Sequence, residues 1–166
     1  MGLLSYKQRA YHRAMMISGT VEIMLQTDPE AAERASLVIS RMAPGNEEFM
    51  TQRIHALLIR RKHELALSEI VKLSEKGDPV YRIVLKAWAL SGLSRHREAI
   101  QLIEGLPEYA RDLPAVAIIK AEFAAGLDDV RTVAENCIKA SRGYMFVDRV
   151  RMLFPYLAAR EQWDVI

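Results

Sequence analysis

Side chains capable of acid–base, nucleophilic or metal chemistry are few and scattered in this chain of 166 residues. The histidines are His12, His55, His63 and His96, and the single cysteine is Cys137. Neither adjacent carboxylates nor further cysteines complete a plausible set of metal ligands around the histidines. The sequence also contains no glycine-rich phosphate loop, HExxH, CxxC or G-x-S-x-G pattern. We therefore predict a protein that is not an enzyme and that uses no catalytic residue, metal or cofactor.

A second group of reactive side chains is basic. The sequence predicts that they follow one edge, where pairs of helices turn, and they are Arg60, Arg61, Lys62, Arg95 and Arg97. We interpret this edge as a solvated rim, and a track for RNA or DNA phosphates is the alternative. The formal net charge of +2 gives no strong case for nucleic acid or for an anionic membrane.

The elements that must position these residues are clearest in the segment 87–103, which has the pattern of two amphipathic helices joined by a tight turn. Gly92 is expected to end the first helix and Ser94 to cap the second. The small residues Ala87 and Ala99 would let the two helix axes approach closely. A short turn makes such helices antiparallel neighbours.

The same pattern returns along the chain at a nearly constant spacing. One column of equivalent residues, in the second helix of each pair, has steps of 34, 33 and 34 and consists of Ala32, Ala66, Ala99 and Val133. A column in the first helix consists of Thr20, Ile54, Ala87 and Ala121. A regular period in this range is typical of a helical repeat array.

Three of the reactive residues fall into this periodic scheme. His63 and His96 share one repeat position, so a role in packing or in the turn explains both. Cys137 belongs to a further column with Ser36, Ile70 and Ile103. We therefore expect a buried structural thiol, and a single cysteine is compatible with a reducing cytosol.

The spacing resembles that of the tetratricopeptide repeat family, in which repeat positions 8 and 20 are small, position 17 is bulky and position 32 is often proline. Counting Ala32 as position 20 places Pro44 at position 32. The chain departs from the family pattern because position 17 is histidine twice, position 8 is isoleucine once, and Pro79 comes one residue late. The copies are therefore degenerate and TPR-like.

This resemblance implies an all-α fold in which helical hairpins stack into a right-handed superhelix. The composition agrees, because residues that favour helices dominate and 51% of the chain is hydrophobic. We expect one domain over residues 1–166, with repeats at about 13–45, 47–78, 80–111 and 114–142 and a C-terminal helix at 145–160. Helix starts are expected at Asp28-Pro29, Asn46, Asp78-Pro79 and Asp128.

The resemblance also implies where a ligand would bind. In the family, ligands usually contact repeat positions 2, 5, 9 and 12 of the first helices, which line the concave face. The matching positions here lack the Lys and Asn with which some members clamp a terminal carboxylate, and they are mainly apolar. Tyr81 and Trp88 lie at the middle of this face, and both residue types often dominate binding energy. The expected groove residues are Ile17, Val21, Met24, His55, Leu58, Tyr81, Val84, Trp88 and Ile118.

An apolar groove of this kind suits the apolar side of an amphipathic helix or peptide from a protein partner. We therefore expect a protein-binding scaffold or adaptor, similar in architecture to chaperones that hold a subunit of a type III secretion system. Alternatively, Trp88 packs between repeats, or the terminal helix fills the groove. Two further hypotheses remain. One is a nucleic-acid-binding repeat that uses the basic edge. The other is a self-associating fragment of a longer repeat protein, which forms a homo-oligomer through an unfinished fifth repeat in which Trp163 stands at position 17.

The sequence predicts no membrane segment, because no apolar run approaches the length of about 20 residues that spans a bilayer. The first residues carry Lys7, Arg9 and Arg13 where a signal peptide would be apolar. Tyr6 occupies the place where N-myristoylation requires Ser or Thr. We expect a soluble, cytoplasmic protein.

Overall fold

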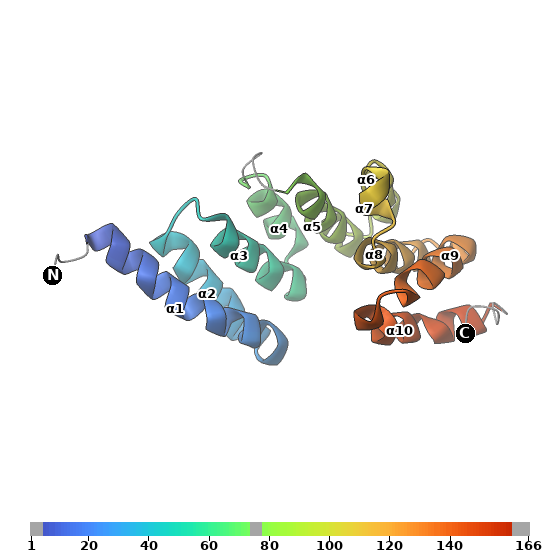
Figure 1. Cartoon of the computed structure of the whole chain (residues 1–166), viewed down its shortest axis with the longest axis horizontal. Coiled ribbons are helices and arrows are strands. Elements are labelled where there is room, and N and C mark those ends of the chain that lie inside the picture. The colour runs from blue at the N-terminus through green and yellow to red at the C-terminus, as the bar shows by residue number, and fades with distance from the viewer. Residues whose placement is uncertain (1–4, 74–77, 161–166) are drawn as a thin grey trace. The chain divides into compact units, whose positions relative to one another are not determined.

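A computed structural model describes residues 5–73 and 78–160, and every regular element in these ranges is a helix (Figure 1). The prediction of an all-α fold is therefore confirmed. The chain divides into two compact units, residues 1–78 and 79–166, which are described separately below. Whether they act as the single predicted domain stays a prediction. Within the described residues, no helix is both long and apolar enough to cross a membrane.

The N-terminal unit consists of two helical hairpins. Its helices are α1 (Tyr6–Thr27), α2 (Pro29–Met42), α3 (Glu47–Ile59) and α4 (His63–Ile70). The predicted starts of α2 and α3 are confirmed, because the side-chain oxygens of Asp28 and Asn46 accept hydrogen bonds from the amides of Ala31 (3.0 Å) and Phe49 (3.1 Å). Helix α4 ends at Ile70, and residues 74–77 of the predicted repeat 47–78 lie outside the described part.

The C-terminal unit contains two further hairpins and a closing helix. Its helices are α5 (Pro79–Gly92), α6 (His96–Glu104), α7 (Glu108–Arg111), α8 (Pro114–Ala125), α9 (Val130–Ser141), the 3-10 helix η1 (Tyr144–Phe146) and α10 (Val147–Ala158). Helix α7 contains only four residues, and Pro155 lies inside α10.

Three hairpins share one turn geometry. Arg61, Ser94 and Asp128 have positive φ angles of 56°, 61° and 59°, and they are spaced by 33 and 34 residues. In each turn the amide of the next residue donates to a carbonyl five residues back, from Lys62 to Leu57 (2.8 Å), Arg95 to Leu90 (3.0 Å) and Asp129 to Ala124 (3.1 Å). This pattern is a Schellman ending, in which a left-handed residue reverses the chain after a helix.

The shared turn corrects two predicted caps. The sequence predicts Ser94 as the cap of α6 and Asp128 as the cap of α9, but both occupy the left-handed position instead. The residue before α6 is Arg95, which makes no side-chain cap hydrogen bond. The residue before α9 is Asp129, whose Oδ1 accepts a hydrogen bond from the amide of Thr132 at 3.1 Å. A left-handed backbone cannot also take the extended conformation that a cap residue normally has.

The predicted repeat columns coincide with burial. All four members of the second-helix column, Ala32, Ala66, Ala99 and Val133, are fully buried. The first-helix column is buried at Ile54, Ala87 and Ala121, but Thr20 is exposed. The first hairpin differs because α1 continues to Thr27 and only Asp28 separates it from α2. The other hairpins have turns of three or four residues, and in the first hairpin Val21 is buried in place of Thr20.

The order of packing also repeats. Inside the N-terminal unit, α3 contacts both helices of the preceding pair, α1 and α2. Inside the C-terminal unit, α8 contacts α5 and α6, and α10 contacts α8 and α9. Each first helix thus lies on the pair before it, which is how consecutive repeats bury a continuous core.

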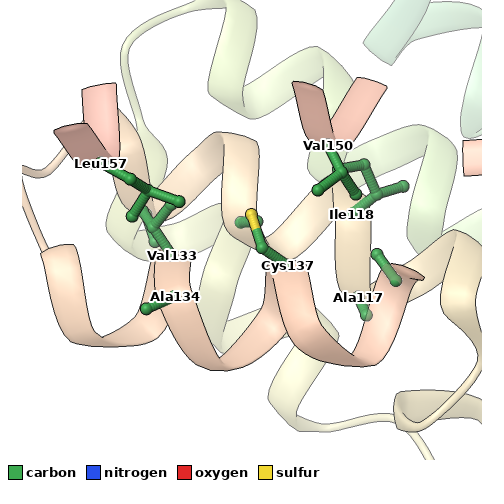
Figure 2. Close-up of a cluster of buried hydrophobic side chains, with 10 residues drawn as sticks. Ala117, Ile118, Val133, Ala134, Cys137, Val150 and Leu157 are labelled. Atoms are coloured by element: carbon green, nitrogen blue, oxygen red, sulfur yellow. The ribbon is translucent and has the colours of Figure 1, made fainter. Parts of the chain in front are cut away.

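The core of the C-terminal unit closes around α9 (Figure 2). Buried side chains from α8, α9 and α10 meet there, among them Ile118, Val133, Cys137, Val150 and Leu157. The expectation that Cys137 is buried is confirmed, since it is 1% exposed. Burial, with a smaller effect of Glu122, raises the pKa of its thiol to about 11. A thiol that stays protonated at neutral pH is a poor nucleophile.

Candidate functional site

The predicted groove residues of the N-terminal unit divide into two kinds. Ile17, Met24 and His55 are half-buried, so part of each side chain is accessible on α1 or α3. Val21 and Leu58 are 0% and 2% exposed, so they lie in the core and are not surface for a partner. Their places in the groove prediction are corrected for that reason.

A buried polar contact that was not predicted from the sequence joins α1 to α3 on this face. The Gln52 amide nitrogen donates to Ser18 Oγ at 2.8 Å, and Ser18 Oγ donates to Glu48 Oε1 at 3.4 Å. Ser18 and Gln52 are each 4% exposed. They occupy the same position in consecutive repeats, 34 residues apart, so the repeat numbering could have indicated that these two side chains meet. Because a polar contact has stricter geometry than an apolar one, it fixes the register of α1 against α3.

Three of the four predicted groove residues of the C-terminal unit lie along α5. Tyr81, Val84 and Trp88 follow one another at steps of three and four residues, which places them on one stripe of the helix. Tyr81 and Trp88 are each 38% exposed and Val84 is half-buried. Burial raises the pKa of the Tyr81 phenol above its ordinary value. This stripe is an accessible surface of apolar bodies with polar tips.

At Ile118, on α8, the predicted groove is covered by α10 of the same unit. Ile118 is fully buried, and Figure 2 shows Val150 of α10 beside it. Glu122, on the same helix, accepts two hydrogen bonds from the Arg149 guanidinium, at 2.9 Å from Nε and 2.5 Å from Nη2. Ile118 is therefore corrected from a partner-binding residue to a core residue. The alternative in which the terminal helix fills the groove holds for this one position.

The predicted basic edge is partly neutralised, because three of its five cations pair with a carboxylate in the same unit. Glu33 pairs with both Lys62 (2.5 Å) and Arg60 (3.5 Å) in the N-terminal unit. In the C-terminal unit, the Arg95 guanidinium makes two hydrogen bonds of 2.6 Å to the Glu98 carboxylate. Arg61 and Arg97 are exposed and make no ion pair within the described residues. Paired cations have less charge to offer to phosphates, and this weakens the nucleic-acid alternative.

A charged cleft of about 480 Å³ lies among α6, α7, α8 and α9. Its two lysines are paired with carboxylates, Lys120 with Glu104 at 3.1 Å and Lys139 with Asp112 at 2.8 Å. The Lys139 ammonium lowers the pKa of the Asp112 carboxyl. This cleft could not be predicted from the sequence, because its residues come from four helices without a common spacing.

The remaining titratable residues of interest are possible metal ligands and the histidine His96. In the described part of the chain, no three His, Cys, Asp or Glu side chains gather in a way that could hold a metal ion. His96 instead packs its ring against Gly126 and shares a 2.8 Å hydrogen bond between Nδ1 and Ser91 Oγ. This contact agrees with a packing role for repeat position 17. No family model, curated protein or solved structure matches the chain.

Proposed function

We propose that this protein is a non-catalytic scaffold that binds a segment of a protein partner on the first helices of TPR-like repeats. The observation that carries the proposal is the stripe of Tyr81, Val84 and Trp88 on α5. It offers two large aromatic side chains, each 38% exposed, on a rigid helix. Aromatic residues held in this way are common anchors of protein interfaces.

The arrangement of the helices supports a TPR-like superhelix as the scaffold. The turns centred on Arg61, Ser94 and Asp128 have one geometry at a spacing of 33 and 34 residues. The columns of small residues are buried at the same spacing. Each first helix within a unit packs on the pair before it. These three regularities are expected when hairpins of one kind are stacked in one way.

The partner surface that fits this stripe is the apolar side of an amphipathic helix. Anchors at steps of three and four residues match the spacing of side chains along one face of a partner helix. Holding an aggregation-prone helical subunit, as secretion chaperones do, is one form that this function would take.

The test is a pull-down of the tagged chain from its native cells at moderate salt, followed by mass spectrometry. The proposal expects one stoichiometric protein partner. That partner is lost from the double variant Tyr81→Ala/Trp88→Ala, whose helical circular dichroism stays unchanged.

A matched control removes the same kind of side chain from elsewhere in the same unit. Tyr109 and Tyr144 are 71% and 86% exposed and lie outside α5. The variant Tyr109→Ala/Tyr144→Ala should keep the partner. Equal loss in both variants, or unfolding of the Tyr81/Trp88 variant alone, would contradict a binding role for the stripe. Recovery of only further copies of this chain would favour self-association.

A further inference from the structure

An arginine-lined cleft lies on the first hairpin, outside the predicted groove. It has a volume of about 600 Å³ and is lined by Arg9, Ala10, Arg13, Val38, Arg41 and Met42. Arg9 and Arg13 stand one turn apart on α1, and Arg41 lies in the last turn of α2. The antiparallel hairpin brings the beginning of α1 to the end of α2 (Figure 1), so the three guanidinium groups share one cleft.

The lining of the cleft provides no carboxylate that would neutralise these guanidinium groups. None of the lining residues is acidic, and within the described part of the chain Arg9, Arg13 and Arg41 form no ion pair. The cleft in the C-terminal unit is the internal comparison, because there Lys120 and Lys139 each have a carboxylate partner. Three guanidinium groups in one cleft give it a positive charge that an anion binding among them would neutralise.

Helix electrostatics account for only one of the three arginines. Arg41 is favourable at the end of α2, where the helix dipole is negative. Arg9 lies in the first turns of α1, where the dipole is positive and where no acidic side chain occupies the first turn. Arg9 and Arg13 are also like charges at i and i+4, a spacing that destabilises an isolated helix. The two α1 arginines are therefore placed against the local preference.

The rest of the cleft is apolar. Ala10, Val38 and Met42 lie among the arginines, and Val38 is 48% exposed. A guanidinium binds a carboxylate through two parallel hydrogen bonds, and an apolar floor accepts an aliphatic side chain beside it. The lining contains no aromatic ring on which a nucleic-acid base would stack. The combination favours a peptide over a nucleic acid.

We propose that this cleft binds an acidic segment of a protein, in which glutamate or aspartate side chains alternate with aliphatic ones. The ligand class is thus a carboxylate-rich peptide with apolar neighbours. The cleft shares no residue with the α5 stripe. Loss of peptide binding at the cleft can therefore be distinguished from loss of a protein partner at the stripe.

The experiment measures fluorescence anisotropy of labelled peptides with the full chain. The probes are one peptide of glutamate and leucine, one of glutamate and serine, one of lysine and leucine, and a single-stranded oligonucleotide of the same length. The glutamate–leucine peptide should bind most tightly and should weaken as salt is added, since exposed charges are screened. Inorganic phosphate added as a competitor tests whether any oxyanion suffices.

The variants Arg13→Gln and Arg41→Gln should each weaken binding of the glutamate–leucine peptide by about tenfold or more, because each removes a charge-assisted hydrogen bond. The matched controls are Arg61→Gln and Arg97→Gln. Each removes the same charge from an exposed arginine that lies outside the cleft and has no ion pair within the described residues. Both control variants should bind the glutamate–leucine peptide normally. The cleft variants should also melt at the same temperature as the parent chain or slightly higher, because they relieve repulsion.

Several results would overturn the proposal. Equal weakening in the control variants would show non-specific charge attraction. Tighter binding of the oligonucleotide would identify a nucleic-acid surface, and full displacement by phosphate at low concentration would identify a small-anion site. A lower melting temperature of the cleft variants would show that the arginines are structural.

Discussion

Ser94 adopts a backbone conformation that the turn requires but that is unfavourable for a residue with a Cβ. Its φ of 61° places it in the left-handed region, which a side chain with a Cβ disfavours and glycine adopts freely. Arg95, not Ser94, is the residue that precedes α6, so Ser94 is not in the cap position. We therefore expect Ser94→Gly to raise the free energy of unfolding by about 0.5–1 kcal/mol. Chemical denaturation followed by circular dichroism measures this change.

The control for that prediction places a glycine in ordinary helix. Gln101 is exposed in the middle of α6, so Gln101→Gly should lower the free energy of unfolding by about 1 kcal/mol. If both variants are destabilised, the turn does not have the left-handed geometry at Ser94.

The contact between Gly126 and His96 leads to a second prediction about a single residue. A Cβ on Gly126 would lie only 2.6 Å from His96 Nε2 and 2.7 Å from Cε1, so the imidazole must move. We expect Gly126→Ala to cost about 1–3 kcal/mol through overpacking. In a His96→Ala background the same substitution should be neutral or stabilising. A double-mutant cycle measures this coupling, and additive effects would contradict the contact.

Two histidines of the N-terminal unit predict its response to acid. Burial lowers the pKa of His55 below its ordinary value of 6.5, against a smaller opposing effect of Glu22. Burial and the nearby Arg61 charge lower the pKa of His63. Below pH 6.5 the unfolded chain therefore binds more protons than the folded chain. The free energy of unfolding should fall as the pH drops through this window.

Urea unfolding at a series of pH values between about 7.5 and 5.5 measures the slope of that loss. The variant His55→Gln should show a shallower slope, because one of the two responsible groups is gone. His12 is exposed on α1, and His12→Gln is the matched control that should keep the parent slope. An unchanged slope in His55→Gln would contradict the role of burial.

At the scale of elements, helix positions could be predicted from the sequence much better than the turns between them. Asp28-Pro29 and Asn46 are local signals, and each is followed by a helix start in the structure. Asp128 and Asp129 are adjacent and chemically alike, so the sequence does not show which one caps α9. The backbone decides this, because the left-handed conformation of Asp128 leaves the cap to its neighbour.

The groove residues could be predicted only in part, for a related reason. The apolar period identifies the stripe of a helix, but the side chains on that stripe meet either solvent or another helix. Ile118 and Val84 have the same repeat position and similar chemistry, yet Ile118 is buried beside Val150 and Val84 remains partly accessible. What separates them is the packing of α10, which is a tertiary contact that no local pattern contains.

The packing of α10 makes its own prediction. Leu157 is fully buried against the core of the C-terminal unit, so Leu157→Ala should cost about 2–4 kcal/mol. Because the same core covers Cys137, its thiol should react faster with a thiol reagent in this variant. Met152 lies on the same helix but is 80% exposed, and Met152→Ala should change neither quantity. Labelling followed by absorbance gives the rate, and equal rates in both variants would contradict the covering role of α10.

At the scale of the whole molecule, the division between Asp78 and Pro79 coincides with the boundary between the second and third predicted repeats. Repeat arrays are stabilised by neighbouring repeats, so a unit folds alone only if its own contacts suffice. In the C-terminal unit, the core around Cys137 is built from α8, α9 and α10, all of which lie beyond residue 79. We therefore expect a fragment of residues 79–166 to be helical and to melt cooperatively.

The thiol of Cys137 reports whether that fragment has the native core rather than helices alone. Its reaction with a thiol reagent should be as slow in the fragment as in the full chain, since the groups that bury it are retained. A shorter fragment of residues 79–143 lacks α10 and serves as the control, in which the thiol should react quickly. If residues 79–166 also react quickly, the C-terminal core depends on the first two repeats. Cooperativity would then extend along the whole array instead of ending at residue 78, and the two units would fold as one.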